Sequence, residues 1–255
     1  MSLHCNRGGL RTGRQLHEML EIERREHRIA WLRTSATIYQ RADRGPMRPV
    51  GRRRGVRPGG LYSSHKNGKM VGFESLAERD AIYCAEVLPQ VVSYRSQPHT
   101  IEAIIDGVAR RYTPDLEETL SNGQIRITEV KEDFEASRDP DYAAKLNLFA
   151  TVYRGMGWDF RILQRREFGG TLEFAGICKV QSFRRVAFDA HDLALVREHL
   201  AGGTRPLGEL ADLFQTPVIG LATVAAMMVA RLMLIDLSGG FTTDALVREF
   251  DDRGA

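Results

Sequence analysis

One stretch, residues 110–131, constrains this chain most, because its turn fixes which side chains face one another. Two β-prone runs flank a Ser-Asn-Gly turn at 121–123, and Asn-Gly between such runs predicts a β-hairpin. A three-residue loop would place Asp115 opposite Glu129 when the pairs are counted back from the turn. Lys131 lies two residues after Glu129 and shares its face of the strand. The register therefore predicts two carboxylates and one ammonium on one side of a two-stranded ribbon.

This charge pattern has a chemical interpretation. Like charges at cross-strand distance repel, so Asp115 and Glu129 need a cation between them. Carboxylate oxygens favour a hard ion such as magnesium, and Lys131 beside it could help deprotonate a water or stabilise phosphate charge. The pattern is typical of a site that cleaves phosphodiesters. An ordinary turn aspartate followed by a charged strand face fits the same residues, since Pro-Asp followed by Glu-x-Lys is common by chance.

A third carboxylate could come from the preceding helical segment. Apolar spacing predicts a helix over Phe73–Val87, which ends before Pro89. Glu74 and Glu78 lie four residues apart and share one face of that helix. Either could reach the acidic pair, or could simply stabilise the helix dipole from the first turn, which is the interpretation favoured for Glu78.

Composition is that of an ordinary globular protein, with 255 residues, 43% hydrophobic and 27% charged. The three cysteines are far apart and lack zinc-ligand spacing, which predicts reduced thiols in a cytoplasmic protein. The N-terminus lacks the order of a secretory signal. An apolar run at Val218–Ile235 is interrupted by Arg231, so we expect a buried helix and no membrane association.

Charge is concentrated at the N-terminal end. Residues 1–60 hold 14 arginines, no lysine and five acids, a net charge of +9, so the other 195 residues sum to −6 within a total of +3. We expect a basic helix over Gly13–Trp31 and an arginine-rich linker over Arg41–Gly60. Arginine suits phosphate, which favours a polyanion partner, although a disordered or partner-docking tail fits as well. Residues that could follow a phosphate backbone are Arg52, Arg53 and Arg54.

Residues 61–170 alternate between helices and short strands. A basic loop with Lys66 and Lys69 precedes the first helix, several strands follow, and a second helix over 138–156 is followed by a strand at 158–163. This order predicts an α/β core with a central mixed sheet flanked by helices. Lys145, on the second helix, would face the edge of the site, where it could contact a phosphate or simply be solvated.

Residues 171–255 have a different character. We expect an extended segment over 173–188, helices over 189–200, 207–214 and 217–234, and a short wing around 235–241. Three helices and a β-turn indicate a winged-helix-like domain, although a small helical bundle fits nearly as well. The third helix has almost no basic residues, which favours a structural or protein-docking role over DNA reading.

Several enzyme classes are excluded by missing motifs. The sequence has no phosphate-binding P-loop, no GxSxG nucleophile elbow and no HExxH or paired-histidine zinc spacing. Energy coupling, if it is needed, must therefore come from another protein.

Four segments together resemble a known family. They are KNGKMVGFESLAERD, VVSYRSQPHTIE, RRYTPDLEETLSNGQIRITEVK and MGWDFRIL, in order between Tyr62 and Glu167. They resemble the TnsA endonucleases, the nuclease subunits of heteromeric transposases. The resemblance implies a restriction-endonuclease-like PD-(D/E)xK fold that cuts DNA with Mg²⁺, for which Mn²⁺ can substitute. By the same resemblance, the catalytic residues are Glu74, Asp115, Glu129 and Lys131, with the three carboxylates as metal ligands and Lys131 assisting the water.

The resemblance also implies partners. These are double-stranded DNA, a transposase subunit of the DDE class and an AAA+ ATPase regulator. Asp189–Phe250 would dock the partners. The protein itself would be cytoplasmic and associated with the nucleoid, and of bacterial or phage origin. Residues Arg52, Arg53, Arg54, Lys66, Lys69 and Lys145 are then candidate DNA contacts. The predicted function is cleavage of one strand at transposon ends. The alternatives are a stand-alone phage or defence nuclease of the same fold, and a non-catalytic DNA-binding assembly module.

Overall fold

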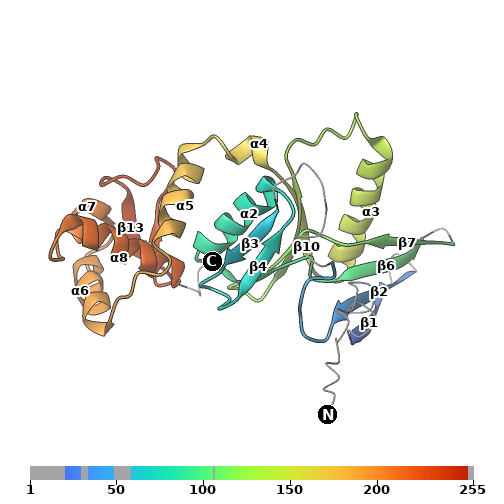
Figure 1. The fold of residues 1–255 in the computed structure, drawn as a ribbon, viewed down its shortest axis with the longest axis horizontal. Helices are drawn as coiled ribbons and strands as arrows, with labels where there is room; N and C mark the ends of the chain where they lie inside the picture. Colours follow the sequence, from blue (N-terminus) through green and yellow to red (C-terminus); the bar gives the residue numbers. More distant parts are fainter. Residues whose placement is uncertain (1–20, 30–33, 49–58, 106, 252–255) are drawn as a thin grey trace, which may run out of the picture.

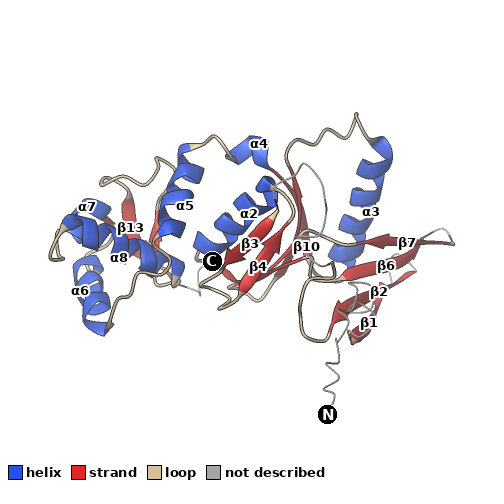
Figure 2. Ribbon diagram, viewed as in Figure 1, coloured by secondary structure: helices blue, strands red, loops and turns tan. Residues whose placement is uncertain are grey.

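The computed structural model describes residues 21–29, 34–48, 59–105 and 107–251. Along its long axis, the C-terminal helices lie at one end and an antiparallel sheet lies at the other, with the central sheet between them (Figure 1). The C-terminal end is mostly helical, whereas the centre mixes helices and strands (Figure 2). The molecule is therefore a mixed α/β protein with several sheets.

The central sheet carries the predicted hairpin. In strand order it consists of β10 (Asp159–Gln164), β9 (Ile125–Lys131), β8 (Leu116–Leu120) and β5 (Val91–Ser96). β10 runs parallel to β9, and the other neighbours are antiparallel. The prediction of a central mixed sheet is confirmed.

Two helices cover opposite faces of this sheet. α2 (Leu76–Val87) packs Ala77 and Ala81 against Val130 of β9, whereas α3 (Pro140–Gly155) packs in the same core as Ile127. Val130 and Ile127 are an odd number of residues apart on β9, so they point to opposite faces. Glu129 and Lys131 share the parity of Ile127, so the α3 face carries the predicted polar residues.

The second sheet lies beside α3 (Figure 1). It is antiparallel, and its strands in order are β1 (Ile22–Ile29), β2 (Thr34–Arg41), β6 (Thr100–Ile105) and β7 (Val108–Tyr112). The helix predicted over Gly13–Trp31 is wrong for Ile22–Ile29, and its first eight residues lie outside the described residues. Alternating charges suggested helical ion pairs, but the β-branched sequence of β2 offers a pairing partner, and tertiary pairing overrides weak helix propensity.

A small hairpin of β3 (Gly60–Ser63) and β4 (Met70–Phe73) lies against α2. Tyr62 and Val71 bury their side chains with Ile82 of α2 and Tyr94 of β5. The basic loop that contains Lys66 and Lys69 joins the two strands. This hairpin therefore belongs to the packing around the central sheet.

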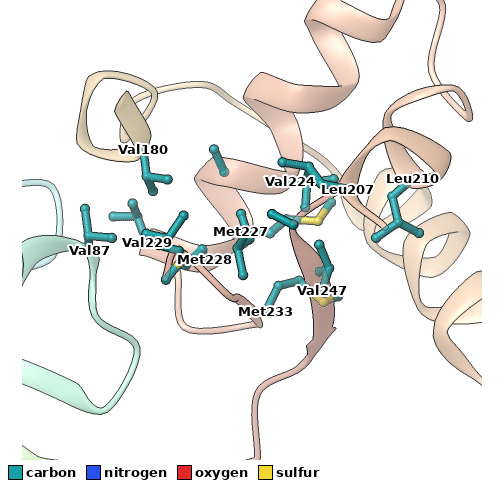
Figure 3. Close-up of a cluster of buried hydrophobic side chains, with 14 of the residues drawn as sticks. Val87, Val180, Leu207, Leu210, Val224, Met227, Met228, Val229, Met233 and Val247 are labelled. Carbon is teal, nitrogen blue, oxygen red and sulfur yellow. The ribbon is translucent and has the colours of Figure 1, made fainter. Parts of the chain in front are cut away.

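The C-terminal part forms its own apolar core. Its elements are α4 (Arg165–Phe168), α5 (Leu172–Ser182), α6 (Ala190–Leu200), β11 (Arg205–Pro206), α7 (Leu207–Ala211), α8 (Pro217–Val229), β12 (Met233–Ile235) and β13 (Leu246–Glu249). The short strands pair in the order β11-β13-β12. Met227, Leu207 and Val247 meet at its centre (Figure 3).

The extended conformation predicted for residues 173–188 is wrong over α5. Thr171 caps the helix by accepting a hydrogen bond from the Phe174 amide, and Phe174, Ile177 and Val180 recur at helical spacing and are buried. The three predicted helices that follow are present, with Asp189 as the N-cap of α6, but the last one ends at Val229 and Met233–Ile235 form strand β12 instead. α7 and α8 pack so closely that a Cβ added to Gly220 would lie 2.2 Å from the Ala211 carbonyl oxygen.

Val87, at the end of α2, belongs to the same apolar cluster as α5 and α8 (Figure 3). The C-terminal core is therefore continuous with the helix that supports the central sheet. Within the part of the chain that the structure describes, every helix is too short or too polar to cross a membrane.

Candidate active site

The hairpin of β8 and β9 has the register that the turn predicts. Thr119 pairs with Ile125 and Leu116 with Thr128, while Gly123 adopts φ +81° in the loop. Continuing the count places Asp115 opposite Glu129. The Val130 amide donates a hydrogen bond to Asp115 Oδ2 at 2.8 Å. The two predicted carboxylates therefore lie together.

The chain changes sheets just before Asp115. The first β-prone run of the predicted hairpin began at Arg110, but Arg110–Tyr112 instead end β7, and that strand pairs with β6. Pro114 has no amide hydrogen to continue a ladder, so pairing stops there and β8 begins at Leu116 in the central sheet. Asp115 is thereby held at the junction between the two sheets.

Glu129 is nearly enclosed, with 3% exposure, and is surrounded by donors. The Tyr142 hydroxyl donates to Oε1 at 2.5 Å, and the Lys131 ammonium lies 2.6 Å from the same oxygen. The Tyr112 hydroxyl donates to Oε2. Buried carboxylates are tolerated when such partners replace water. The predicted convergence of Glu129 and Lys131 is confirmed.

The charges at this site perturb one another. Burial, and then the Glu129 carboxylate, raise the pKa of Asp115 to about 8, although the Val130 amide and Lys131 partly oppose the shift. Burial opposes the charged form of Lys131, but Glu129 outweighs it and the pKa of Lys131 is raised. Two close carboxylates resist being ionised together unless a cation joins them. The acidic pair therefore has the electrostatics of a cation site.

A cleft of about 850 Å³ opens over these residues. Its floor includes Asp115, Glu129 and Lys131. Basic side chains that also line it are Arg48, Arg111, Lys145 and Arg165. The rim is mixed in charge, because the exposed acids Glu132 and Asp133 line the cleft too. The four cations at the rim suit a phosphate-bearing polymer whose backbone they hold and whose reacting group lies at the floor.

The two candidate third carboxylates differ in position. Glu78 lines the cleft, and burial, then Glu74 and Glu129, raise its pKa against its own hydrogen bonds. Glu74 is not among the residues that line the cleft, and its amide donates to Glu78 Oε2 at 2.8 Å. Ser75 caps α2 by accepting a hydrogen bond from the Glu78 amide, and its hydroxyl donates to Glu78 Oε1, so Glu78 is also the first-turn acid of the alternative interpretation. The geometry brings Glu78 closer to the acidic pair, and Glu74 as a metal ligand stays a prediction.

The predicted DNA contacts fall into different surroundings. Lys145 lines the cleft, one turn after Tyr142 on α3. Lys69 is exposed and lines a second groove, of about 290 Å³, together with Arg44 and Arg95. The residues Arg52, Arg53 and Arg54 lie outside the described residues.

Lys66 has a structural role. Its ammonium donates to the carbonyl oxygens of Ala85 and Leu88, both at 2.9 Å, at the C-terminal end of α2. A cation there complements the helix dipole. Burial lowers the pKa of Lys66 to about 7, although Glu86 opposes the shift. These surroundings do not support the prediction that Lys66 binds DNA.

Sequence reasoning missed several residues of the cleft. Tyr112 and Tyr142 hydrogen-bond Glu129, and the only sequence signal was the spacing of Tyr142 three residues before Lys145 on one helix face. Arg165 reaches the rim because its guanidinium pairs with the fully buried Asp80 at 2.6 Å. That pairing crosses 85 residues of sequence, so local patterns carried no sign of it.

The residues present fit a magnesium ion. Among the described residues, no cluster of three or more His, Cys, Asp or Glu side chains is arranged to hold a metal ion. Magnesium does not need such a cage, because it commonly uses one or two carboxylates and completes its octahedron with water and substrate phosphate. Asp115 and Glu129 supply that minimum.

A mixed α/β fold with this cleft is consistent with an endonuclease. A family model described as TnsA-like endonuclease N terminal matches residues 88–165. This match confirms the resemblance found in the sequence: residues 88–165 are similar to the TnsA-like endonuclease domain, which supports a nuclease related to transposase subunits. The matched segment contains Asp115, Glu129 and Lys131, whereas α2 with Glu78 precedes it. A search of curated proteins found no match.

Proposed function

We propose that this chain is a magnesium-dependent DNA endonuclease that cuts one strand at transposon ends as a subunit of a heteromeric transposase. The observation that carries the proposal is the convergence of Asp115, Glu129 and Lys131 at the floor of a basic-rimmed cleft within a TnsA-like domain. Restriction-endonuclease-like folds of the PD-(D/E)xK type use such a set, and the fold here is consistent with that assignment.

Asp115 and Glu129 would hold the ion, and Glu78 is favoured over Glu74 as the third carboxylate because it lines the cleft. A bound Mg²⁺, or Mn²⁺ in its place, would supply Lewis-acid stabilisation of phosphoryl charge and lower the pKa of water. Lys131 is kept protonated by Glu129, so its ammonium is suited to stabilise the charge that develops on phosphate oxygens rather than to accept a proton.

The rim would bind the DNA backbone. Arg48, Arg111, Lys145 and Arg165 come from four separate elements or loops around the cleft, which spreads positive charge along its edges. Phosphate contacts of this kind position the duplex without reading its sequence. Lys69 and its groove are a further candidate path for the backbone.

The C-terminal part would dock partners. Its order of helix, short strand, two helices and two paired strands is that of a winged helix, so we propose residues 171–255 as a winged-helix-like domain beside a nuclease domain at 61–170. α8 carries no charged residue, which favours protein docking over base reading. The expected partners are a DDE-class transposase and an AAA+ ATPase regulator.

Cleavage of transposon-end DNA tests this proposal. The full chain is incubated with Mg²⁺, alone and together with a DDE-class transposase and an AAA+ ATPase, and strand breaks are mapped on a denaturing gel. The parent should cut, while Asp115→Ala and Lys131→Ala should cut at least about 100-fold more slowly. Cutting by the chain alone at unrelated DNA would favour a stand-alone nuclease. No cutting in any mixture, with DNA binding intact, would favour a non-catalytic assembly module.

A further inference from the structure

The hydroxyl of Tyr142 stands at the centre of the site without belonging to any recognised motif in the sequence. Tyr142 follows Pro140 and Asp141 in the first turn of α3, and it lines the cleft. Its hydroxyl donates to Glu129 Oε1 at 2.5 Å. The Lys131 ammonium lies 2.6 Å from the same oxygen and 4.8 Å above the centre of the Tyr142 ring. One tyrosine therefore contacts both functional side chains of β9.

The position of the Tyr142 ring is itself fixed. Asp139 caps α3 and accepts a hydrogen bond from the Tyr142 amide at 3.0 Å. The ring of Phe134 packs edge-on against the Tyr142 ring, with centroids 6.1 Å apart. A side chain held by its backbone and by a neighbouring ring loses little entropy when it forms a hydrogen bond, so it can hold a partner in one rotamer.

The other carboxylate oxygen of Glu129 also accepts a hydrogen bond. Tyr112 donates to Oε2 from the core, where its ring stacks on Phe149 at 5.1 Å. The two hydroxyls thus reach the two oxygens of one carboxylate from β7 and α3, two elements on the same face of the central sheet. A glutamate has a flexible side chain, and opposing hydrogen bonds at both oxygens restrict it to a single orientation.

We infer that Tyr142 is a positioning residue, which holds the Glu129 carboxylate and the Lys131 ammonium in the orientation needed to receive a divalent cation. The inference rests on the proposed function, because it concerns the same site. Groups that orient metal ligands through hydrogen bonds contribute about 10-fold to 100-fold to metal affinity. Tyr142 acts through Glu129, so its contribution disappears when that carboxylate is removed.

The chain offers a matched control on the same helix. Tyr153, later on α3, is fully buried and its hydroxyl lies 2.8 Å from His99 Nε2. Tyr142→Phe and Tyr153→Phe each remove one hydrogen-bonded hydroxyl from α3, and only the first removes a contact with Glu129. Tyr142→Phe also keeps the ring beneath Lys131, so the change isolates the hydroxyl.

The test measures binding of Mn²⁺ alone to the full chain, with free Mn²⁺ followed by electron paramagnetic resonance. Tyr142→Phe should weaken Mn²⁺ binding about 10-fold, Tyr153→Phe should leave it within about twofold, and Tyr142→Phe should add nothing in a Glu129→Gln background. Thermal unfolding of each variant checks that the fold persists.

Two results would overturn the inference while leaving the metal site in place. Equal Mn²⁺ affinity in parent and Tyr142→Phe would show that the hydroxyl does not position Glu129. Tighter binding by Tyr142→Phe would show that the hydroxyl competes with the metal. Failure of the proposed function looks different, because the parent itself would then bind no Mn²⁺, and the inference would fall with it.

Discussion

The central sheet and the C-terminal core of this protein are stabilised in different ways. In the central sheet, Glu117, Glu118 and Glu129 are 7%, 1% and 3% exposed, and each is paired with a cation. In the C-terminal core, among the described residues after 170, the buried side chains are apolar except Thr223. Burying a carboxylate is costly even when it is paired, whereas apolar burial is favourable in itself.

This difference indicates that the central sheet carries the functional site and that the C-terminal core supports it. Charges gathered at a cost in stability, with perturbed pKa values beside a cleft, are typical of a functional site. A core of Met, Val and Leu that joins α2 through Val87 is typical of a rigid support. Changes in the first region should therefore alter activity more than stability, and changes in the second should do the reverse.

Among the residues whose role the sequence left open, the largest expected effect comes from the third carboxylate. Glu78→Gln should slow DNA cleavage about 100-fold, because it removes the carboxylate that lines the cleft beside Asp115. Glu74→Gln, four residues earlier and just before the start of α2, should slow cleavage less than about threefold and serves as its control. The measurement is a single-turnover cleavage rate with both variants at equal folded fraction. A larger loss in Glu74→Gln would reverse the assignment.

In the C-terminal core we expect a substitution to change stability. Met227→Ala leaves a cavity in the fully buried C-terminal core and should lower the free energy of unfolding by about 2–5 kcal/mol. Urea denaturation measures this loss. Because Met227 is remote from the cleft, the affinity for Mn²⁺ at low temperature should stay unchanged. A fall in that affinity without unfolding would break the separation between the two regions.

Lys66 lies where the two regions meet, and its titration should make the free energy of unfolding depend on pH. Burial lowers its pKa to about 7 against an ordinary value of 10.5, while Glu86 and Glu118 oppose the shift and Arg231 adds to it. The unfolded chain therefore binds more protons than the folded chain between about pH 7 and 10.5. The free energy of unfolding should rise with pH in that window, by up to about 1.4 kcal/mol per pH unit from this group.

Lys66→Met removes the titrating group and should remove that part of the slope. Urea denaturation at pH 7 and pH 9 gives the comparison, since other groups titrate alike in parent and variant. If both proteins gain the same stability between the two pH values, Lys66 is not the source.

The smallest effect concerns DNA binding at the rim. Lys145→Ala should reduce the slope of log affinity against log salt concentration by about 0.9, because one phosphate contact is lost. Arg205→Ala, an exposed cation of the C-terminal region, should leave the slope unchanged. Binding titrations at several salt concentrations measure both. Equal reductions would mean that DNA covers both regions.

Local sequence signals were sufficient for part of this fold and site. The Asn-Gly turn determines the β8–β9 register, so Asp115, Glu129 and Lys131 could be brought together from the sequence alone. The helices α2, α3 and α6 carry strong periodicity and caps, and they were predicted close to their observed ends. Each of these features depends on residues within a single hairpin or a single helix.

Features that depend on distant pairing escaped prediction. β1 is polar and becomes a strand only because β2 pairs with it, and α5 was predicted as extended although Thr171 caps it. The hydroxyls that reach Glu129 come from two other elements, and the choice between Glu78 and Glu74 depends on how α2 packs against β9. The prediction that Glu74 and Glu78 share one helix face is wrong, because α2 begins at Leu76 behind its Ser75 cap and Glu74 lies before the helix.

Cleavage of a DNA duplex by the full chain and its partners, with and without divalent metal, tests the central claim most directly. The parent should cut with Mg²⁺ or Mn²⁺ and stop when the metal is chelated, Asp115→Asn should lose the activity, and Asp133→Asn, another acid that lines the cleft, should keep it. Cutting that persists after chelation, or in Asp115→Asn at the parent's rate, would contradict the account.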